Sequence, residues 1–249
     1  MPKRRLRLIK TLAKSLNIFF MFIDNLNFLI CDCKNEKNYR IIMQSAFIKI
    51  LKNGSILSLL ETNVSTEKLI ESLNWEESKL ESLNKIQSEK KKKEWLGVRL
   101  LLCEIFKDQP FELSYDNQGK PFLADPLYNI SISHSGIYVC VLLNEKSAVG
   151  VDIQEFKPNI ERGTALFMST QELKDCGETL EDNRLHIYWG AKEAIYKFIG
   201  LTQTDIKNDI YISPFKLGAS GKLFGKILDE KTLVLEYVIE KEYVLVYTI

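Results

Sequence analysis

The stretch WGAKEAIYKFIG, residues 189–200, carries the strongest fold signal in this chain. Residues four apart lie on one face of a helix, so Trp189, Glu193 and Lys197 form a single stripe if the stretch is helical. Gly200 stands where a glycine commonly ends a helix. The stretch therefore predicts a helix that ends at Gly200 and presents an acid and a base one turn apart.

A second stretch, VGVDIQ at residues 149–154, predicts a strand. Side chains alternate between the two faces of a strand, so Asp152 and Gln154 point to the same side. Val151 and Ile153 then face a hydrophobic core. The strand is expected to carry a polar pair on one face and apolar side chains on the other.

If the strand packs on the helix, Asp152, Gln154 and Glu193 converge on one point. Magnesium prefers oxygen ligands and usually binds one or two carboxylates together with substrate phosphates. Lys197 would neutralise phosphate charge at the same place. A structural interpretation stands beside this one, because Glu193 and Lys197 also have the spacing of an ordinary surface ion pair, which stabilises a helix by only about 0.2–0.5 kcal/mol.

Two further motifs precede these stretches in the chain. Gly119-Lys120-Pro121 is followed by NISISHSG at residues 129–136. The ordered set, covering about residues 90–200, resembles the 4'-phosphopantetheinyl transferase superfamily in its long, two-halved form. The family pattern is GKP, then SHS, then G-[IV]-D-[IV]-E, then W-x-x-KEA-x-x-K-x-x-G. Each motif alone is weak, and their common order and spacing make the resemblance specific.

The resemblance implies a reaction and a set of roles. Family members move the 4'-phosphopantetheine arm of coenzyme A onto a serine of an apo acyl or peptidyl carrier protein, releasing 3',5'-ADP. Asp152 and Glu193 match the family's magnesium ligands, and Glu193 is also the expected base for the carrier serine. Lys197 matches the lysine that contacts the diphosphate. A wider set of residues is expected to hold the nucleotide and its phosphates: Arg99, Lys120, Ser133, His134, Lys192 and Lys197. Of these, His134 is also expected to be a catalytic residue.

One position departs from the family pattern. The second acid of the strand motif is Gln154 here, and an amide oxygen carries no charge. We expect Gln154 to be a weaker metal ligand, or to be replaced by water. Glu155 is adjacent but points to the other face of the strand, so it is not counted as a ligand.

Composition limits the other classes of function. The chain has 249 residues with 45% hydrophobic and 27% charged side chains, which is typical of a soluble globular protein. A net charge of +1 gives no general case for nucleic-acid binding. The local exception is the lysine run 90–93, which is either a solvated helix start or a region that attracts phosphate or an acidic carrier protein. Five unpatterned cysteines favour a reduced, cytoplasmic protein, in which Cys103 and Cys140 fill the core and His186 is structural.

Residues 1–42 differ from the rest. Basic residues precede an apolar stretch at 18–30, but Asp24, Asn25 and Asn27 interrupt it, which leaves too short a run to span a bilayer. We expect residues 1–42 to be a dispensable extension, with a peripheral membrane helix as the alternative. No stable membrane insertion is expected.

The remainder predicts an α+β fold built from two similar tandem α/β halves, 43–147 and 148–249, related by a pseudo-twofold axis. The active site is expected at their seam, and the two-halved length implies a monomer. Helices are expected at 91–106 and up to Gly200, with a capping box at Ser169-Thr170-Gln171-Glu172. Strands are expected at 46–51, 111–114, 128–133, 138–143, 148–153, 209–212, 222–227, 232–239 and 242–248.

Three readings of function remain open. The first is an active transferase. The second is a non-catalytic binder of coenzyme A or of carrier proteins, for which Gln154 would be the lesion. A metal-dependent nuclease is the third, and it lacks the acid and lysine two apart on a strand that such enzymes usually carry. The apolar residues at 166–168 are either core or a groove for the helix of a carrier protein.

Overall fold

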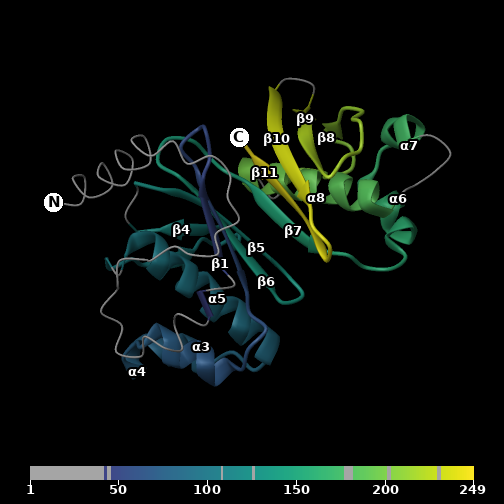
Figure 1. Cartoon of the computed structure of the whole chain (residues 1–249). Helices are drawn as coiled ribbons and strands as arrows, with labels where there is room; N and C mark the ends of the chain where they lie inside the picture. Colours follow the sequence, from purple (N-terminus) through teal and green to yellow (C-terminus); the bar gives the residue numbers. More distant parts are fainter. Residues whose placement is uncertain are drawn as a thin grey trace, which may run out of the picture. The chain divides into compact units, whose positions relative to one another are not determined.

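The computed structural model describes residues 42–43, 46–107, 109–124, 127–176, 182–200, 203–228 and 231–249 (Figure 1). All of them belong to the unit Asp32–Ile249. The expected extension at residues 1–42 lies outside the described residues except for Ile42, which is 2% exposed and packs into a hydrophobic core. Ile42 itself therefore belongs to the folded unit. Among the described helices, none is both long enough and apolar enough to cross a membrane.

The first sheet contains four antiparallel strands in the order β1-β2-β6-β5. Their bounds are Ala46–Ile50 (β1), Ile56–Glu61 (β2), Tyr138–Asn144 (β6) and Asn129–Ser135 (β5). Helix α5 (Glu89–Phe106) packs on one face of this sheet. The side chain of Ser88 caps α5 by accepting from the backbone N–H of Lys91. The expected helix at 91–106 is thus confirmed, and it begins two residues earlier.

Smaller elements surround α5. Helices α3 (Thr66–Leu73) and α4 (Glu77–Asn84) precede it, and a short hairpin of β3 (Leu113–Tyr115) and β4 (Pro121–Leu123) follows it. The Gly119-Lys120-Pro121 motif lies in the turn of this hairpin, where Gly119 has a φ of +81° that suits only glycine without strain. The hairpin places Lys120 beside the second half of the chain.

The second sheet has the order β7-β11-β10-β9-β8, with every neighbouring pair antiparallel. Its strands are Val151–Glu155 (β7), Tyr243–Thr248 (β11), Lys231–Ile239 (β10), Ser220–Ile227 (β9) and Ile210–Ile212 (β8). Helix α8 (Asp182–Ile199) packs across it, and Gly200 ends the helix with a φ of +69°. The predicted helix end is confirmed, and the strands expected at 232–239 and 242–248 form the antiparallel pair β10–β11.

Short helices lead from β7 to α8. They are a 3-10 turn (Ile160–Gly163), α6 (Thr164–Phe167) and α7 (Thr170–Cys176). The capping box at α7 is reciprocal: the backbone N–H of Glu172 donates to Ser169 Oγ, and the backbone N–H of Ser169 donates to Glu172 Oε2, at 3.2 and 2.8 Å. The expectation for residues 169–172 is therefore confirmed.

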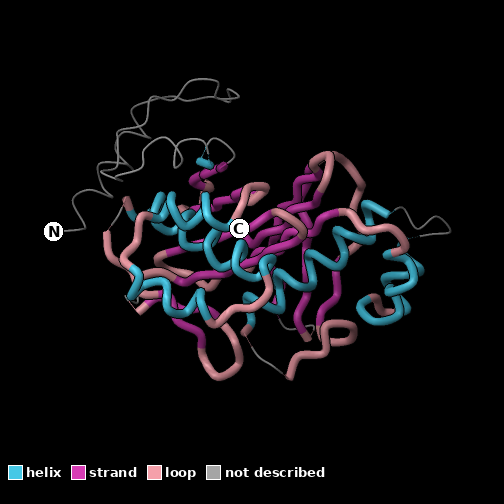
Figure 2. The backbone as a smooth tube through the Cα atoms, turned by 90° about the horizontal axis from the view of Figure 1, so that it is seen from below, coloured by secondary structure: helices cyan, strands magenta, loops and turns pink. Residues whose placement is uncertain are grey.

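The two sheets pack face to face, so strand β6 is buried on both of its faces. Val139, Val141 and Leu143 join the core under α5, whereas Cys140 and Leu142 join a core shared with β7 and β11. The buried members of the shared core are Leu51, Leu57, Leu59, Tyr138, Cys140, Leu142, Val149, Val151, Ile153, Leu245 and Tyr247. Figure 2 shows the helices and strands of the same unit from below.

The mixed helix and sheet content confirms an α+β fold. Each sheet is built from one continuous part of the chain and carries one helix of 18 residues, α5 or α8. A pseudo-twofold relation between the halves stays a prediction, because the first sheet has four strands in the order β1-β2-β6-β5 and the second has five.

Candidate active site

Asp152 is the centre of a polar cluster where β5, β7 and α8 meet. Its side chain is almost fully buried at 2% exposure. Oδ1 accepts hydrogen bonds from Ser133 Oγ at 2.8 Å and from Lys197 Nζ at 2.7 Å, and Oδ2 accepts from Gln154 Nε2 at 2.7 Å. As expected, Val151 and Ile153 point the other way and are fully buried. The predicted face of β7 therefore carries Asp152 and Gln154 together.

Glu193 lies on α8, within electrostatic range of both Asp152 and Lys197. Burial raises the pKa of Glu193, the negative charge of Asp152 raises that pKa further, and Lys197 opposes the shift. A carboxylate in this position holds its proton more strongly than a solvent-exposed one. A nearby cation, or a proton donated by a substrate, would relieve the unfavourable charge.

The oxygen-bearing side chains of this cluster are of the kinds that bind magnesium. Asp152 and Glu193 supply two carboxylates that raise each other's energy when both are charged, and Gln154 supplies an amide beside them. No group of three His, Cys, Asp or Glu side chains suited to a metal occurs in the described part of the chain, so the third oxygen here would have to come from the amide or from water. Gln154 now turns its N–H toward Asp152, and a half-turn of that amide would present its oxygen instead.

Lys197 reaches the cluster from the last turn of α8. Its ammonium donates to Ser133 Oγ, to the backbone oxygen of Val151 and to Asp152 Oδ1, at 2.9, 3.1 and 2.7 Å. An ammonium has three N–H groups, so all of its donors are engaged. To contact a diphosphate, Lys197 must therefore exchange one of these acceptors for a phosphate oxygen.

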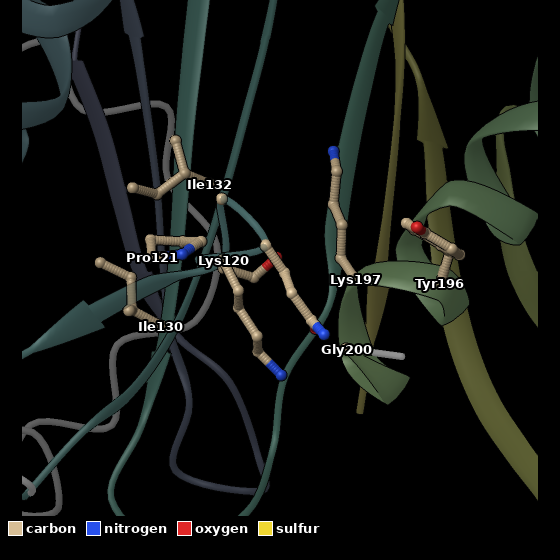
Figure 3. Close-up of a pocket in the computed structure, with 10 residues that line it drawn as sticks. Lys120, Pro121, Ile130, Ile132, Tyr196, Lys197 and Gly200 are labelled. Carbon is tan, nitrogen blue, oxygen red and sulfur yellow. The ribbon is translucent and has the colours of Figure 1, made fainter. Parts of the chain in front are cut away.

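A cavity of about 180 Å³ opens beside Lys197, between the first and second halves of the chain. Figure 3 shows Pro121, Ile130 and Ile132 on one side and Tyr196 and Lys197 of α8 on the other. Lys120 reaches across from the β3–β4 turn and lies against Gly200, where a side chain in place of the glycine would collide with its Nζ. The site thus brings Lys120 and Lys197 to one cavity.

Two further candidates lie on the α5 side. His134 on β5 is half exposed, and its Nδ1 lies 3.2 Å from Glu94 Oε1 of α5. The guanidinium carbon of Arg99 lies 3.4 Å from the ring centroid of Trp95, and burial lowers the pKa of Arg99 to about 10. No ion pair to Arg99 occurs among the described residues. Arg99 Nη1 donates to the backbone oxygen of Trp95 at 3.1 Å, and a buried cation stacked on an aromatic ring is suited to an anionic ligand.

Lys192 has surroundings unlike those of a ligand-binding residue. We expected it to hold the nucleotide; its side chain is fully buried, and its ammonium contacts three backbone oxygens and an acid. The acid is Glu172 of α7, at 2.8 Å and also fully buried. Lys192 has no donor left for a ligand, so it ties α8 to α7 and to the segment before β8. We therefore assign it a structural role.

Other expectations have clear outcomes. Cys103 and Cys140 are buried, and His186 is buried and accepts a hydrogen bond from the backbone N–H of Lys157. Of the apolar residues at 166–168, Phe167 and Met168 belong to the core, whereas Leu166 is 80% exposed. In the lysine run, Lys92 pairs with Glu89 and Lys90 with Glu94, which favours the solvated helix start.

Several residues of the site escaped the sequence-based analysis. Glu94 and Tyr196 stand at positions that no motif specifies, and the capping box marks Glu172 only as a helix cap, because the roles of all three depend on partners far along the chain. The alternation of Ser131, Ser133 and Ser135 is visible in the sequence and indicates one polar face of a strand. Each of these hydroxyls accepts a hydrogen bond from a backbone N–H of β7.

Comparison with known proteins agrees with this geometry. Residues 148–246, which contain β7, α8 and most of the second sheet, match the family described as the 4'-phosphopantetheinyl transferase superfamily. The chain is 33% identical over 115 residues to 4'-phosphopantetheinyl transferase AcpT of Escherichia coli K12, an alignment that covers 43% of this chain and 57% of that protein.

Two other relatives give similar values. Over 109 residues the chain is 32% identical to the AcpT protein of Salmonella typhimurium, covering 41% of this chain and 56% of that one. Over 125 residues it is 28% identical to a phosphopantetheinyl transferase of Thraustochytrium, covering 42% and 43%. The chain spans about half the length of these curated relatives. The segment at residues 148–246 is therefore similar to the 4'-phosphopantetheinyl transferase superfamily.

Proposed function

We propose that this chain transfers the 4'-phosphopantetheine arm of coenzyme A to a serine of an apo acyl or peptidyl carrier protein. The observation that carries the proposal is the convergence of Asp152, Glu193 and Lys197, of which Lys197 also lines a cavity between the two halves of the chain. Two carboxylates and an ammonium in one cluster suit a magnesium-bound diphosphate. The family match of residues 148–246 supports the same proposal independently.

The reaction makes one bond and breaks one. The carrier serine oxygen bonds to the phosphorus that bears the pantetheine arm, the bond from that phosphorus to the bridging oxygen of the diphosphate breaks, and 3',5'-ADP leaves with the bridging oxygen. Glu193 accepts the serine proton as a general base. Asp152, Glu193 and the amide of Gln154 would hold magnesium, which when bound neutralises charge on the diphosphate.

The cations have separate tasks in this proposal. Lys197 exchanges one of its present acceptors for a diphosphate oxygen and stabilises the leaving group. Lys120 at the cavity, and Arg99 and His134 on the α5 side, hold the phosphates of the nucleotide. Leu166 on α6 is an exposed apolar contact for the helix of a carrier protein. The expectations of a monomer and of a cytoplasmic location belong to the same proposal.

The test is the intact mass of an apo acyl carrier protein after incubation with the purified chain, coenzyme A and Mg²⁺. The proposal predicts a mass gain equal to one phosphopantetheine arm, which is lost with Glu193→Gln and with excess EDTA. No gain with carriers of the fatty-acid, polyketide and peptide-synthetase types would contradict it.

A non-catalytic binder is the second candidate, and the uncharged Gln154 is the observation that favours it. A binder predicts measurable coenzyme A affinity with no mass gain on any carrier. In that case Gln154→Glu, which restores the family's acid, is the variant to assay next.

A further inference from the structure

We infer that Ser133 is a positioning residue that holds Asp152 and Lys197 in a fixed arrangement, and that it does not bind the nucleotide. The inference rests on the proposed function, because it concerns the same magnesium and diphosphate site. It departs from the role that the family resemblance implies for this serine. The single hydroxyl of Ser133 makes all of its hydrogen bonds within the protein.

The hydroxyl of Ser133 has no remaining hydrogen-bonding capacity. It donates to Asp152 Oδ1 at 2.8 Å, and it accepts from the backbone N–H of Ile153 at 3.2 Å and from Lys197 Nζ at 2.9 Å. A serine hydroxyl offers one proton and two lone pairs, so all three are occupied. The side chain is also buried, with 5% of the residue exposed. A nucleotide oxygen or phosphate would have to break one of these bonds to reach it.

The neighbouring serines show what is particular to Ser133. Ser131 Oγ accepts from the backbone N–H of Val151 at 3.1 Å, and Ser135 Oγ accepts from that of Glu155 at 3.0 Å. With Ser133 and Ile153, these pairs keep a constant offset of 20 residues, so β5 and β7 run in the same direction. All three serines therefore join the two strands. Bonds from the hydroxyl to Asp152 and Lys197 occur only at Ser133 among the described residues.

The effect is to fix the carboxylate of Asp152. Ser133 and Lys197 both hold Oδ1, which leaves Oδ2 on the side of Gln154 and α8. Oδ2 approaches α8 at Gly190, where an added Cβ would lie 3.7 Å from it, and Gly190 shares a helix face with Glu193 three residues later. A metal held between Asp152 and Glu193 would therefore meet Oδ2. Losing a partner that orients a metal ligand typically weakens metal affinity by about 10–100-fold.

The experiment compares Ser133→Ala with Ser131→Ala, a matched variant that loses the same kind of bond between β5 and β7 but no contact with Asp152 or Lys197. Mn²⁺ affinity is measured by electron paramagnetic resonance without coenzyme A or carrier, and coenzyme A affinity is measured by calorimetry in EDTA. We expect both variants to lower the urea midpoint by similar amounts. Only Ser133→Ala should weaken Mn²⁺ binding, by about tenfold or more, while Ser131→Ala stays within about twofold. Ser133→Thr, which keeps the hydroxyl, should restore the affinity.

Equal Mn²⁺ affinities for the two alanine variants would overturn the inference, as would a wild-type chain that binds no Mn²⁺. So would a Ser133→Ala variant that keeps its Mn²⁺ affinity but loses coenzyme A affinity, because that result identifies a nucleotide ligand. If Ser133→Ala fails to fold, the decision passes to Ser133→Cys, whose weak donor should give intermediate Mn²⁺ affinity. A wild type that binds Mn²⁺ as expected yet transfers nothing to any carrier would contradict the proposed transferase and leave the role of Ser133 intact.

Discussion

At the scale of single residues, buried charges around Asp152 determine how the site responds to pH. Burial and the charge of Asp152 both raise the pKa of Glu193. Between the ordinary carboxyl pKa and this raised value, the folded state binds more protons than the unfolded state. Stability of the metal-free chain therefore falls as pH rises through that interval.

The corresponding prediction concerns Glu193→Gln in EDTA. Glutamine cannot ionise, so the variant should have a higher free energy of unfolding than the wild type at neutral pH. The difference should shrink as the pH falls below the ordinary carboxyl range, where Glu193 is protonated in both states. Urea denaturation at a series of pH values measures it. A gain that does not change with pH would show that packing, and not charge, is responsible.

Gln154 is the residue at which this chain departs from the pattern of the family that it resembles. Gln154→Glu adds a third carboxylate beside Asp152 and Glu193, and carboxylate charge is one determinant of how tightly an oxygen site holds a divalent cation. We expect the Mg²⁺ concentration at half-maximal transfer rate to fall on the order of tenfold, and the melting temperature in EDTA to fall as well. As the control, Gln154→Ala should lower neither the Mg²⁺ concentration at half-maximal rate nor the melting temperature in EDTA. A Gln154→Glu variant with unchanged Mg²⁺ dependence would argue against Gln154 as a ligand.

Lys192 and Glu172 form an ion pair in which both side chains are fully buried. Removing one partner of such a pair leaves an uncompensated charge and typically costs about 3–5 kcal/mol. Lys192→Met should lower the free energy of unfolding by about that amount, and adding Glu172→Gln should recover part of it. Urea denaturation of the two variants checks the expectation. Full stability of Lys192→Met, with weakened coenzyme A binding, would return Lys192 to the ligand set.

At the scale of elements, the close approach of β7 to α8 positions the site. Gly150 precedes β7, and a Cβ there would collide with the backbone oxygen of Ala194 and lie 3.0 Å from the Cβ of Phe198. The motif glycine is therefore required for packing, so that Asp152 and Glu193 face each other.

Gly150→Ala should push β7 away from α8. We expect a loss of about 1–3 kcal/mol in stability and a fall in transfer rate of about 100-fold, since a displacement of about 1 Å at a reacting centre has that order of effect. Gly163→Ala is the matched control, because no atom lies within 4 Å of its added Cβ. Equal rates for the two variants would contradict the packing argument.

The elements differ in how well the sequence predicts them. Helices α5 and α8 and the α7 cap were predictable because they carry local signals, namely Ser88, Gly200 and the Ser169–Glu172 box. Strand β2 and helices α3 and α4 were missed. β2 is buried at most of its positions, so it lacks the alternation that marks a strand with one face in water. The segment that forms α3 and α4 is rich in charged residues.

At the scale of the whole unit, the site is made by contact between residues far apart in the sequence. Motif residues such as Asp152, Glu193 and Lys197 were predictable because family members share them. The meeting of β5 with β7 through serine hydroxyls was not, since it depends on how two separate sheets pack. The same limit explains Lys192, which has the motif position of a ligand and the surroundings of a core residue.

The most direct test of the account compares two acids on β7 by the intact mass of a carrier protein incubated with coenzyme A and Mg²⁺. Asp152 faces Lys197, whereas Glu155 lies against Gly136 on the other side of the strand. Asp152→Asn should abolish the gain of one phosphopantetheine arm, and Glu155→Gln should keep it at the wild-type rate. A wild type without the gain, or an Asp152→Asn variant that is as active as Glu155→Gln, would contradict the claim that this seam is the transferase site.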